Sequence, residues 1–149
     1  MIALIQRVSR AQVTVRSEVV ASASRGILAL IGIAATDSIE TGARLIDRVL
    51  GYRIFADEAG KMNLSIRDID GDLVLVPQFT LVAETSKGNR PGFSGGASPD
   101  QARALYGKLL MTARTLYPKV ASGVFGADMQ VELVNDGPAT FWLEARNGA

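Results

Sequence analysis

The alternation of hydrophobic and polar residues near the start of the chain predicts a series of β-strands. Two strands are expected over residues 2–9 and 12–16, where apolar and polar side chains alternate. Ser17-Glu18 predicts a turn into a third strand near residues 19–23. Residues 26–33 are continuously apolar, which is typical of a strand buried on both faces.

Two segments carry apolar residues at helical spacing. The first predicts a helix over residues 38–50, with Asp37 as N-cap and Glu40 completing a capping box. The second begins at Ser98, whose hydroxyl is expected to cap a helix that ends before Pro118.

The rest of the chain predicts short strands joined by turns. Apolar runs of strand length lie at 52–56, 73–76, 79–82, 129–134 and 141–145. Residues 84–97 form a long glycine-rich loop, and long loops in compact domains are often functional. The fold class expected is a single mixed α/β domain over residues 1–149, with mainly antiparallel β-sheets packed against two main helices.

Composition removes most ordinary catalytic groups. The chain has no cysteine and no histidine. Disulfides, thiolate nucleophiles, zinc sites built on those residues and imidazole bases are therefore excluded. An enzyme of this composition depends on carboxylates, hydroxyls, lysine, backbone dipoles or the substrate itself.

Charge and hydropathy bear on location and partners. The longest uncharged runs have 11 residues, whereas a helix that spans a bilayer needs about 20. With no signal-peptide pattern at the N-terminus, a cytoplasmic location is expected, with no membrane contact. The formal net charge is only +1, but residues 87–119 carry six basic groups against one acidic group. This local excess leaves RNA binding and an ordinary solvated face both open.

Three motifs could carry chemistry. Asp68, Asp70 and Asp72 alternate as in a calcium loop, but no glutamate closes the pattern, so solvated turn residues are the simpler interpretation. Pro77 opens the run PQFTL, and a proline beside a strand leaves backbone groups unpaired. Residues 135–140 form either a hairpin turn or a bend whose carbonyls point into a pocket.

Taken together, these stretches resemble the D-aminoacyl-tRNA deacylase family over nearly the whole chain. The segments that carry the resemblance are MIALIQRVSRAQVTV at 1–15, RIF at 53–55, GKMNL at 60–64, QFTL at 78–81, Lys87-Gly88 with Arg90-Pro91, FGADMQ at 125–130 and VNDGPAT at 134–140. Each segment alone is a weak signal. Their order and spacing in a chain of this length are specific.

The resemblance implies an activity and an assembly. The activity is hydrolysis of the ester that joins a D-amino acid, or glycine mischarged on alanine tRNA, to the 3′-terminal adenosine of tRNA. The assembly is a homodimer in which a cis Gly137-Pro138 motif enters the partner subunit's site. No metal or cofactor is implied.

The resemblance also implies roles for individual residues. Gln78, Phe79 and Thr80 are expected to form the catalytic segment. The residues expected to bind substrate are Gly137, Pro138, Phe125, Met129, Ala139, Thr140 and Arg7, of which Arg7 braces the Gly-Pro motif. Lys87 and Arg90 are expected to contact the tRNA.

Pro77 departs from the family pattern, which has serine at that position. A related branch that edits L-alanine carries proline there, but it has a small residue in place of Phe79. Phe79 and an intact VNDGPAT motif therefore favour the D-specific branch, and Pro77 removes any hydroxyl or N–H role at that position. The other classes left open are a non-catalytic RNA-binding dimer and a metal hydrolase built on Asp68, Asp70 and Asp72.

The mechanism expected without histidine or cysteine uses backbone and substrate. Carbonyls of Gly137 and Pro138 would accept protons of the α-ammonium group, and a backbone N–H at Phe79 would donate to the ester carbonyl. The tRNA 2′-hydroxyl would orient water. Rigid main chain would reject an L side chain by overlap.

Overall fold

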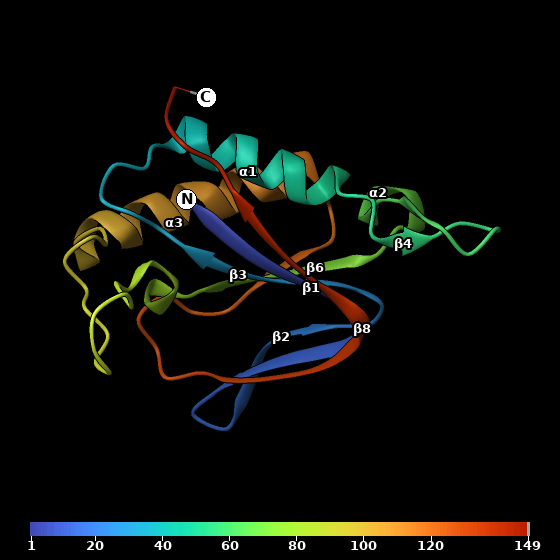
Figure 1. The fold of residues 1–149 in the computed structure, drawn as a ribbon. Helices are drawn as coiled ribbons and strands as arrows, with labels where there is room; N and C mark the ends of the chain where they lie inside the picture. The colour runs from blue at the N-terminus through green and yellow to red at the C-terminus, as the bar shows by residue number, and fades with distance from the viewer. Residues whose placement is uncertain (149) are drawn as a thin grey trace.

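The structure, a computed structural model, describes residues 1–148 as a mixed β-sheet with two long helices on one face (Figure 1). The strands run in the order β2 (Glu18–Ala23), β1 (Ile2–Val15), β3 (Gly26–Gly32), β6 (Asp72–Pro77) and β7 (Val120–Ser122), with β8 (Gln130–Glu144) paired to β1. The long helices are α1 (Ile39–Gly51) and α3 (Pro99–Leu116). The α/β domain with two main helices is therefore confirmed.

β1 organises the sheet as one strand of 14 residues, where the sequence predicted two. One edge of β1 pairs with β8 over nearly its whole length. The other edge pairs first with β3, from Ile2 to Val8, and then with β2, from Ala11 to Val15. The polar stretch between the two predicted strands stays extended because β8 pairs with it, including Arg10 opposite Val134.

Hydrophobic residues form two cores on opposite faces of the sheet. Side chains of β3 that alternate in direction enter both, with Ile27 in the core under the helices and Leu28 in the core under β2. The first core holds Leu45 and Ile46 of α1 and Leu109 of α3. β3 is thus buried on both faces, as its continuous apolar pattern predicted.

β3, β6 and β7 run parallel, whereas the other pairs of the main sheet are antiparallel. The carboxyl ends of β3 and β6 therefore lie at the same edge, where Ile31 is opposite Pro77. Within residues 1–148, neither long helix is apolar enough to cross a membrane.

The segment after β6 differs from its predicted conformation. Residues 79–82 were expected to form a strand, but they form the 3₁₀ helix η1 (Phe79–Val82). The last ladder bond is donated by the Gln78 N–H to the carbonyl of Ile31, at 2.8 Å. Beyond it the sheet offers no partner, and the chain turns on local hydrogen bonds from Leu81 to Gln78 and from Ala83 to Thr80.

The carboxyl-terminal hairpin predicted around residues 135–138 is also wrong. β8 continues through this stretch, and both of its halves pair with β1 instead of with each other. Gln6 lies opposite Thr140 and Val8 opposite Asn135, so residues 136–139 bulge from the ladder opposite Arg7 alone. The turn-forming residues of the motif build a bulge within one strand.

Short elements complete the fold. The strand predicted at 52–56 is reduced to β4 (Phe55–Ala56), which pairs with β5 (Met62–Leu64). β5, β7 and the one-turn helix α2 (Ile66–Ile69) were not predicted, because segments of three or four residues carry little periodicity.

The three aspartates around α2 have structural partners. Asp68 completes a capping box with Ser65, whose backbone hydrogen bond lowers the pKa of that carboxyl group. Asp70 pairs with Lys119 at 2.8 Å, and Asp72 accepts a hydrogen bond from the backbone of Ser24. Within residues 1–148, no cluster of carboxylates has the arrangement of a metal site.

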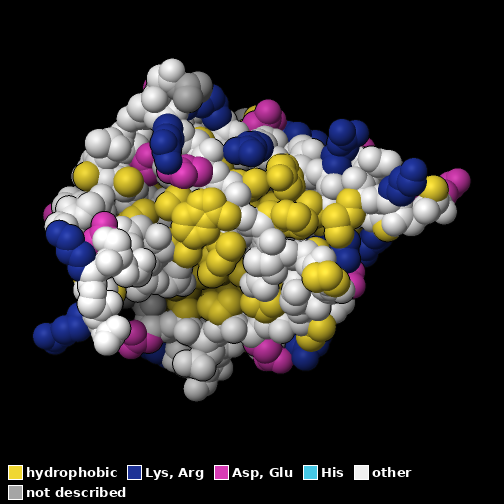
Figure 2. Space-filling model, viewed as in Figure 1, with side chains coloured by type: hydrophobic (Ala, Val, Ile, Leu, Met, Phe, Trp, Pro, Cys, Tyr) yellow, Lys and Arg dark blue, Asp and Glu magenta, His cyan; other side chains and the backbone are white. Residues whose placement is uncertain are grey.

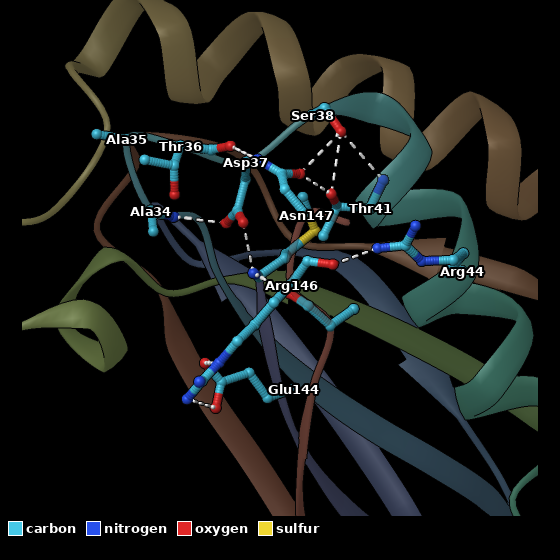
Figure 3. A network of polar contacts seen from close by, with 12 residues as sticks. Ala34, Ala35, Thr36, Asp37, Ser38, Thr41, Arg44, Glu144, Arg146 and Asn147 are labelled. Carbon is cyan, nitrogen blue, oxygen red and sulfur yellow. Dashed lines mark hydrogen bonds and ion pairs between the residues drawn. The ribbon is translucent and has the colours of Figure 1, made fainter. Parts of the chain in front are cut away.

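Asp37 has a different role from the predicted cap. Ser38 caps α1 by accepting from the N–H of Thr41, because the helix begins one residue later than expected. Asp37 instead binds the ammonium group of Met1 at 2.6 Å, and it accepts from the N–H of Ala34 at 2.7 Å (Figure 3). The side chains of this ion pair are almost fully buried.

Polar contacts extend this network to the end of the chain. Asn147 accepts from the hydroxyl of Thr41 and donates to the carbonyl of Thr36, and Arg44 donates to the carbonyl of Arg146 (Figure 3). The start of β1, the start of α1 and the segment after β8 are thus joined at one place.

We expect Asp37→Asn to lower the free energy of unfolding by about 3 kcal/mol, because it leaves a buried ammonium group without its counter-charge. Urea denaturation measures the loss. Asp47→Asn is the matched control, since Asp47 pairs with Arg67 on the surface and should cost less than about 1 kcal/mol. Equal losses in the two variants would contradict this assignment.

Candidate active site at the carboxyl ends of β3 and β6

An apolar pocket of about 280 Å³ opens where β3 and β6 end. The residues that line it are Ile31, Ile33, Pro77, Gln78, Phe79, Val82, Phe93, Gly96, Ala97, Pro99, Ala102 and Phe125. A second pocket of about 260 Å³ overlaps it, since six of the seven residues that line the second pocket also line the first, and it extends to Gly126. Carboxyl ends of parallel strands are a usual place for ligand sites, because the connections diverge there.

Two residues of the predicted catalytic segment, Gln78 and Phe79, line this pocket, whereas Thr80 lines neither pocket. Gln78 is the last residue bonded to the sheet, and its side-chain amide donates to the hydroxyl of Thr80. Phe79 follows, with 64% of its surface exposed. No side chain of residues 1–148 caps η1, so the first N–H groups of that helix, those of Phe79 and Thr80, have no partner within it.

The glycine-rich loop forms the opposite wall. Phe93 lies with its ring centroid 5.4 Å from that of Phe79. The loop is closed at its base by paired hydrogen bonds between Glu84 and Gly92, and a second bridge joins Ala34 to Gly96. The sequence assigns Phe93 no role, because nothing in it shows which element an aromatic residue of a loop will face.

Lys87 and Arg90 project from the exposed part of this loop, between the two sides of the Glu84–Gly92 bridge. Nearby, the Glu84 carboxylate accepts hydrogen bonds from Ser86, which lower its pKa. The loop therefore presents two cations close to the pocket.

Phe125 lines both pockets, and Tyr106 is buried next to it without lining either one. The two rings are 6.2 Å apart, and the Tyr106 hydroxyl bonds to the carbonyl of Leu75 and to the hydroxyl of Ser122. Burial raises the pKa of Tyr106 to about 12. Tyr106 is therefore a neutral structural group at physiological pH. Met129 is half-buried against the second core and is not among the residues that line either pocket.

The Gly-Pro motif lies elsewhere, in the bulge of β8, and the Gly137-Pro138 peptide bond is cis. Arg7 holds the bulge from the neighbouring strand. Its Nε donates to the carbonyl of Asp136 at 2.9 Å, and its Nη1 donates to the carbonyl of Ile54 at 2.6 Å. The Asp136 carboxylate also lies 3.2 Å from Nε.

Asn135 closes the bulge from within. Its side-chain amide donates to the carbonyls of Arg7 and Ala139, at 3.0 and 3.2 Å. A Cβ added at Gly137 would overlap the Oδ1 atom of this fixed amide, so only glycine fits there. Sequence reasoning included Asn135 in the motif but did not assign it this role.

The remaining predicted residues flank the bulge. Ala139 is buried, and Thr140 accepts a hydrogen bond from Gln6 at 3.3 Å. Gly137 and Pro138 themselves are exposed. Their backbone is thus held firmly from behind while its outer side is open to solvent.

Within one chain, the bulge of β8 lies far from the carboxyl ends of β3 and β6, where the pocket opens. Arg7, opposite the bulge, is in register with Ile27 and through it with Leu73, five residues before Gln78. β1 and β3 separate β8 from β6. At about 3.3 Å per residue and 4.8 Å per strand, the separation is roughly 20 Å. The sequence predicted both groups, and the fold does not bring them together in one chain.

Comparison with known proteins identifies the family. The family described as D-Tyr-tRNA(Tyr) deacylase matches residues 4–144. The chain belongs to this family. It is therefore an enzyme, an ester hydrolase that deacylates D-aminoacyl-tRNA, which excludes the non-catalytic RNA-binding alternative.

Individual relatives are similar over their full length. A D-aminoacyl-tRNA deacylase of Alkalilimnicola ehrlichii is 56% identical over 149 residues, which cover 100% of this chain and 99% of that protein. One of Thioalkalivibrio sulfidiphilus is 56% identical over 144 residues, which cover 97% of each chain. A solved structure titled c-Myc DNA Unwinding Element Binding Protein superposes with a TM-score of 0.93 at 38% identity, covering 98% of this chain and 99% of that one.

The geometry restricts how a deacylase of this kind works. Apart from the neutral amide of Gln78, the residues that line the first pocket have apolar side chains, and Tyr106 stays protonated. The other polar groups considered for catalysis are the backbone N–H groups at the start of η1 and the exposed backbone of Gly137-Pro138. Such groups can orient and polarise an ester, but they do not act as nucleophiles.

We expect Tyr106 to make stability sensitive to alkaline pH. Its folded-state pKa of about 12 exceeds the ordinary value of 10.0, so its contribution is complete below pH 10 and is lost as the pH rises to 12. The loss is on the order of 3 kcal/mol. Denaturation of Tyr106→Phe should show a correspondingly smaller decline over that range, although its stability at pH 8 is lower. An unchanged decline would show that Tyr106 does not titrate in this way.

Proposed function

We propose that the chain deacylates D-aminoacyl-tRNA at a composite site, in which the pocket of one subunit is completed by the Gly137-Pro138 bulge of a second copy. Supporting this, the bulge is braced by Arg7 and Asn135 yet exposed, roughly 20 Å from its own pocket. A rigid exposed group remote from its own site is what a partner's site requires.

The surface around the bulge also supports an association of two copies. In residues 1–148, β8 pairs only with β1, so its outer edge is free. Val131, Val134 and Trp142 of β8 are exposed hydrophobic residues. Figure 2 shows hydrophobic side chains gathered across the middle of this face. An apolar patch beside an open strand edge is typical of a protein–protein interface.

The bulge would fix the amino group of the substrate. Carbonyl oxygens of Gly137 and Pro138 are acceptors, and an α-ammonium group is a donor with three protons. With the amino group and the ester carbonyl both held, enantiomers differ by exchanging the α-hydrogen and the side chain. A D side chain would point into open space, whereas an L side chain would meet the main chain of the bulge.

The pocket would activate the ester carbonyl. Water adds to the carbonyl carbon, negative charge develops on its oxygen, and the ribose 3′-oxygen leaves with a proton. The N–H of Phe79 would donate to that oxygen, and one such donor contributes roughly 3–4 kcal/mol to the transition state. The neighbouring 2′-hydroxyl of the tRNA would orient the water, supplying the polar group that this chain lacks.

Glycine has no side chain to reject, so glycine mischarged on alanine tRNA would also be a substrate. The Met129 side chain packs against Gly123. Met129 would therefore reach the adenosine only across Gly123, and not from the pocket lining. Lys87 and Arg90 would contact phosphates of the acceptor end, as exposed cations do in single-stranded RNA binding. We place this reaction in the cytoplasm.

We expect Gly137→Ala to reduce single-turnover deacylation of D-Tyr-tRNA at least a hundredfold, because its Cβ displaces the Asn135 amide that closes the bulge. Thr80→Ala should keep activity within about tenfold of the wild type, since no side-chain nucleophile is needed. Gly107→Ala is the matched control, because its Cβ meets open space on α3. The opposite ranking of Gly137 and Thr80 would refute the backbone mechanism.

We expect inactive variants of the two halves to complement each other. Gly137→Ala removes the bulge, and Ala97→Phe fills the pocket that Ala97 lines. When the two variants are co-expressed in equal amounts, half of the dimers contain one subunit of each kind. Each of these mixed dimers has one intact site of two, so about a quarter of wild-type activity should return. Sedimentation shows whether dimers form. Dimers without recovered activity, or a monomeric wild type, would rule out the shared site.

A further inference from the structure

Arg103 is a cation at the rim of the site that has no carboxylate partner among the residues that the structure describes. It is exposed on α3, with its Cζ atom 5.0 Å from the centre of the Phe125 ring. Its Nη2 lies 3.0 Å from the position that a Cβ of Gly126 would occupy. Phe125 and Gly126 both line the second pocket, so the guanidinium group stands directly beside its opening.

The hydrogen-bonding groups of Arg103 are free. Among residues 1–148, its guanidinium group forms no ion pair, and neither Asp100, one turn earlier on α3, nor Asp128 lies within ion-pair distance. When a guanidinium group contacts an aromatic ring, it does so through its flat face. The N–H donors of the guanidinium group point outward in its plane and remain available. Their paired, parallel arrangement matches two oxygens of a phosphate.

We propose that Arg103 binds the phosphodiester that joins the 3′-terminal nucleoside of the substrate to the rest of the RNA. This inference rests on the proposed function, because the two overlapping apolar pockets together would then hold the terminal nucleoside and the amino acid. In this arrangement the RNA chain leaves past the Gly126 side of the second pocket. Its first phosphate then passes Arg103, a cation whose guanidinium group lies against the Phe125 ring.

Two substrates separate phosphate binding from a merely structural role. The first is D-tyrosyl-tRNA, and the second is 3′-D-tyrosyl-adenosine, which has the ester and the nucleoside but no phosphate. Arg103→Gln should raise KM for the tRNA about tenfold with kcat nearly unchanged, and should leave both constants for the adenosine ester unchanged. The salt dependence of kcat/KM on the tRNA should become shallower by about 0.7 in logarithmic slope, the value for one contact to a single strand.

Two further variants sharpen the test. Arg103→Lys keeps the positive charge but loses the paired N–H donors of the guanidinium group. It should therefore restore the wild-type salt dependence of kcat/KM, while KM returns only part of the way to the wild-type value. Lys108→Gln removes the same charge from the same helix, at a shallow groove that Ile39 and Met111 also line, and should change neither substrate's constants.

Each other outcome overturns the inference. Equal losses on both substrates would mean that Arg103 acts only by positioning Phe125, and no loss on either would mean that it is an ordinary surface residue. If Lys108→Gln changed the kinetic constants for the tRNA as much as Arg103→Gln does, the effect would come from the overall positive charge of α3 and not from a contact of Arg103. Failure of the wild type to deacylate D-tyrosyl-tRNA would instead overturn the proposed function, before any variant is compared.

Discussion

The hydrogen bonding of β1 along both edges is the constraint on which the rest of this structure depends. One edge pairs with β8, and the other pairs with β3 and then with β2, so a single strand joins the sheet under the helices to the smaller β-layer below it. Because these ladders fix the register, they also fix where the two functional groups lie. The bulge is held opposite Arg7, and the pocket opens at the far end of the strands that β1 aligns.

The composite site that we propose uses backbone geometry where many hydrolases use reactive side chains. Asn135 and Arg7 donate hydrogen bonds to carbonyls of the bulge and its neighbours. These bonds hold Gly137-Pro138 rigid from behind and leave its outer side free. At the other end, the ladder stops at Gln78, and the chain turns with its first N–H groups unpaired by the helix they begin. Rigid carbonyls and N–H groups need no ionisation, so such a site does not require histidine or cysteine.

Membership of the D-Tyr-tRNA deacylase family agrees with the backbone mechanism that we propose, because the ester bond of an aminoacyl-tRNA is already activated. In that mechanism the main task of the enzyme is selection between mirror-image substrates. Main chain suits that task better than a flexible side chain, because it cannot rotate away from an unwanted group. In the same proposal Arg103 holds the end of the RNA beside the pocket.

The sequence by itself determined the two long helices, the buried strand at 26–33 and the family. Those features depend on local periodicity or on residue types at fixed spacing. It did not determine that residues 79–82 form a 3₁₀ helix, that β8 runs through its turn-like motif, or that Asp37 pairs with the ammonium group of Met1. Each of these depends on which distant segment supplies the hydrogen-bond partner. Only the tertiary structure makes that choice, because partners far apart in the chain are brought together by folding and leave no local pattern.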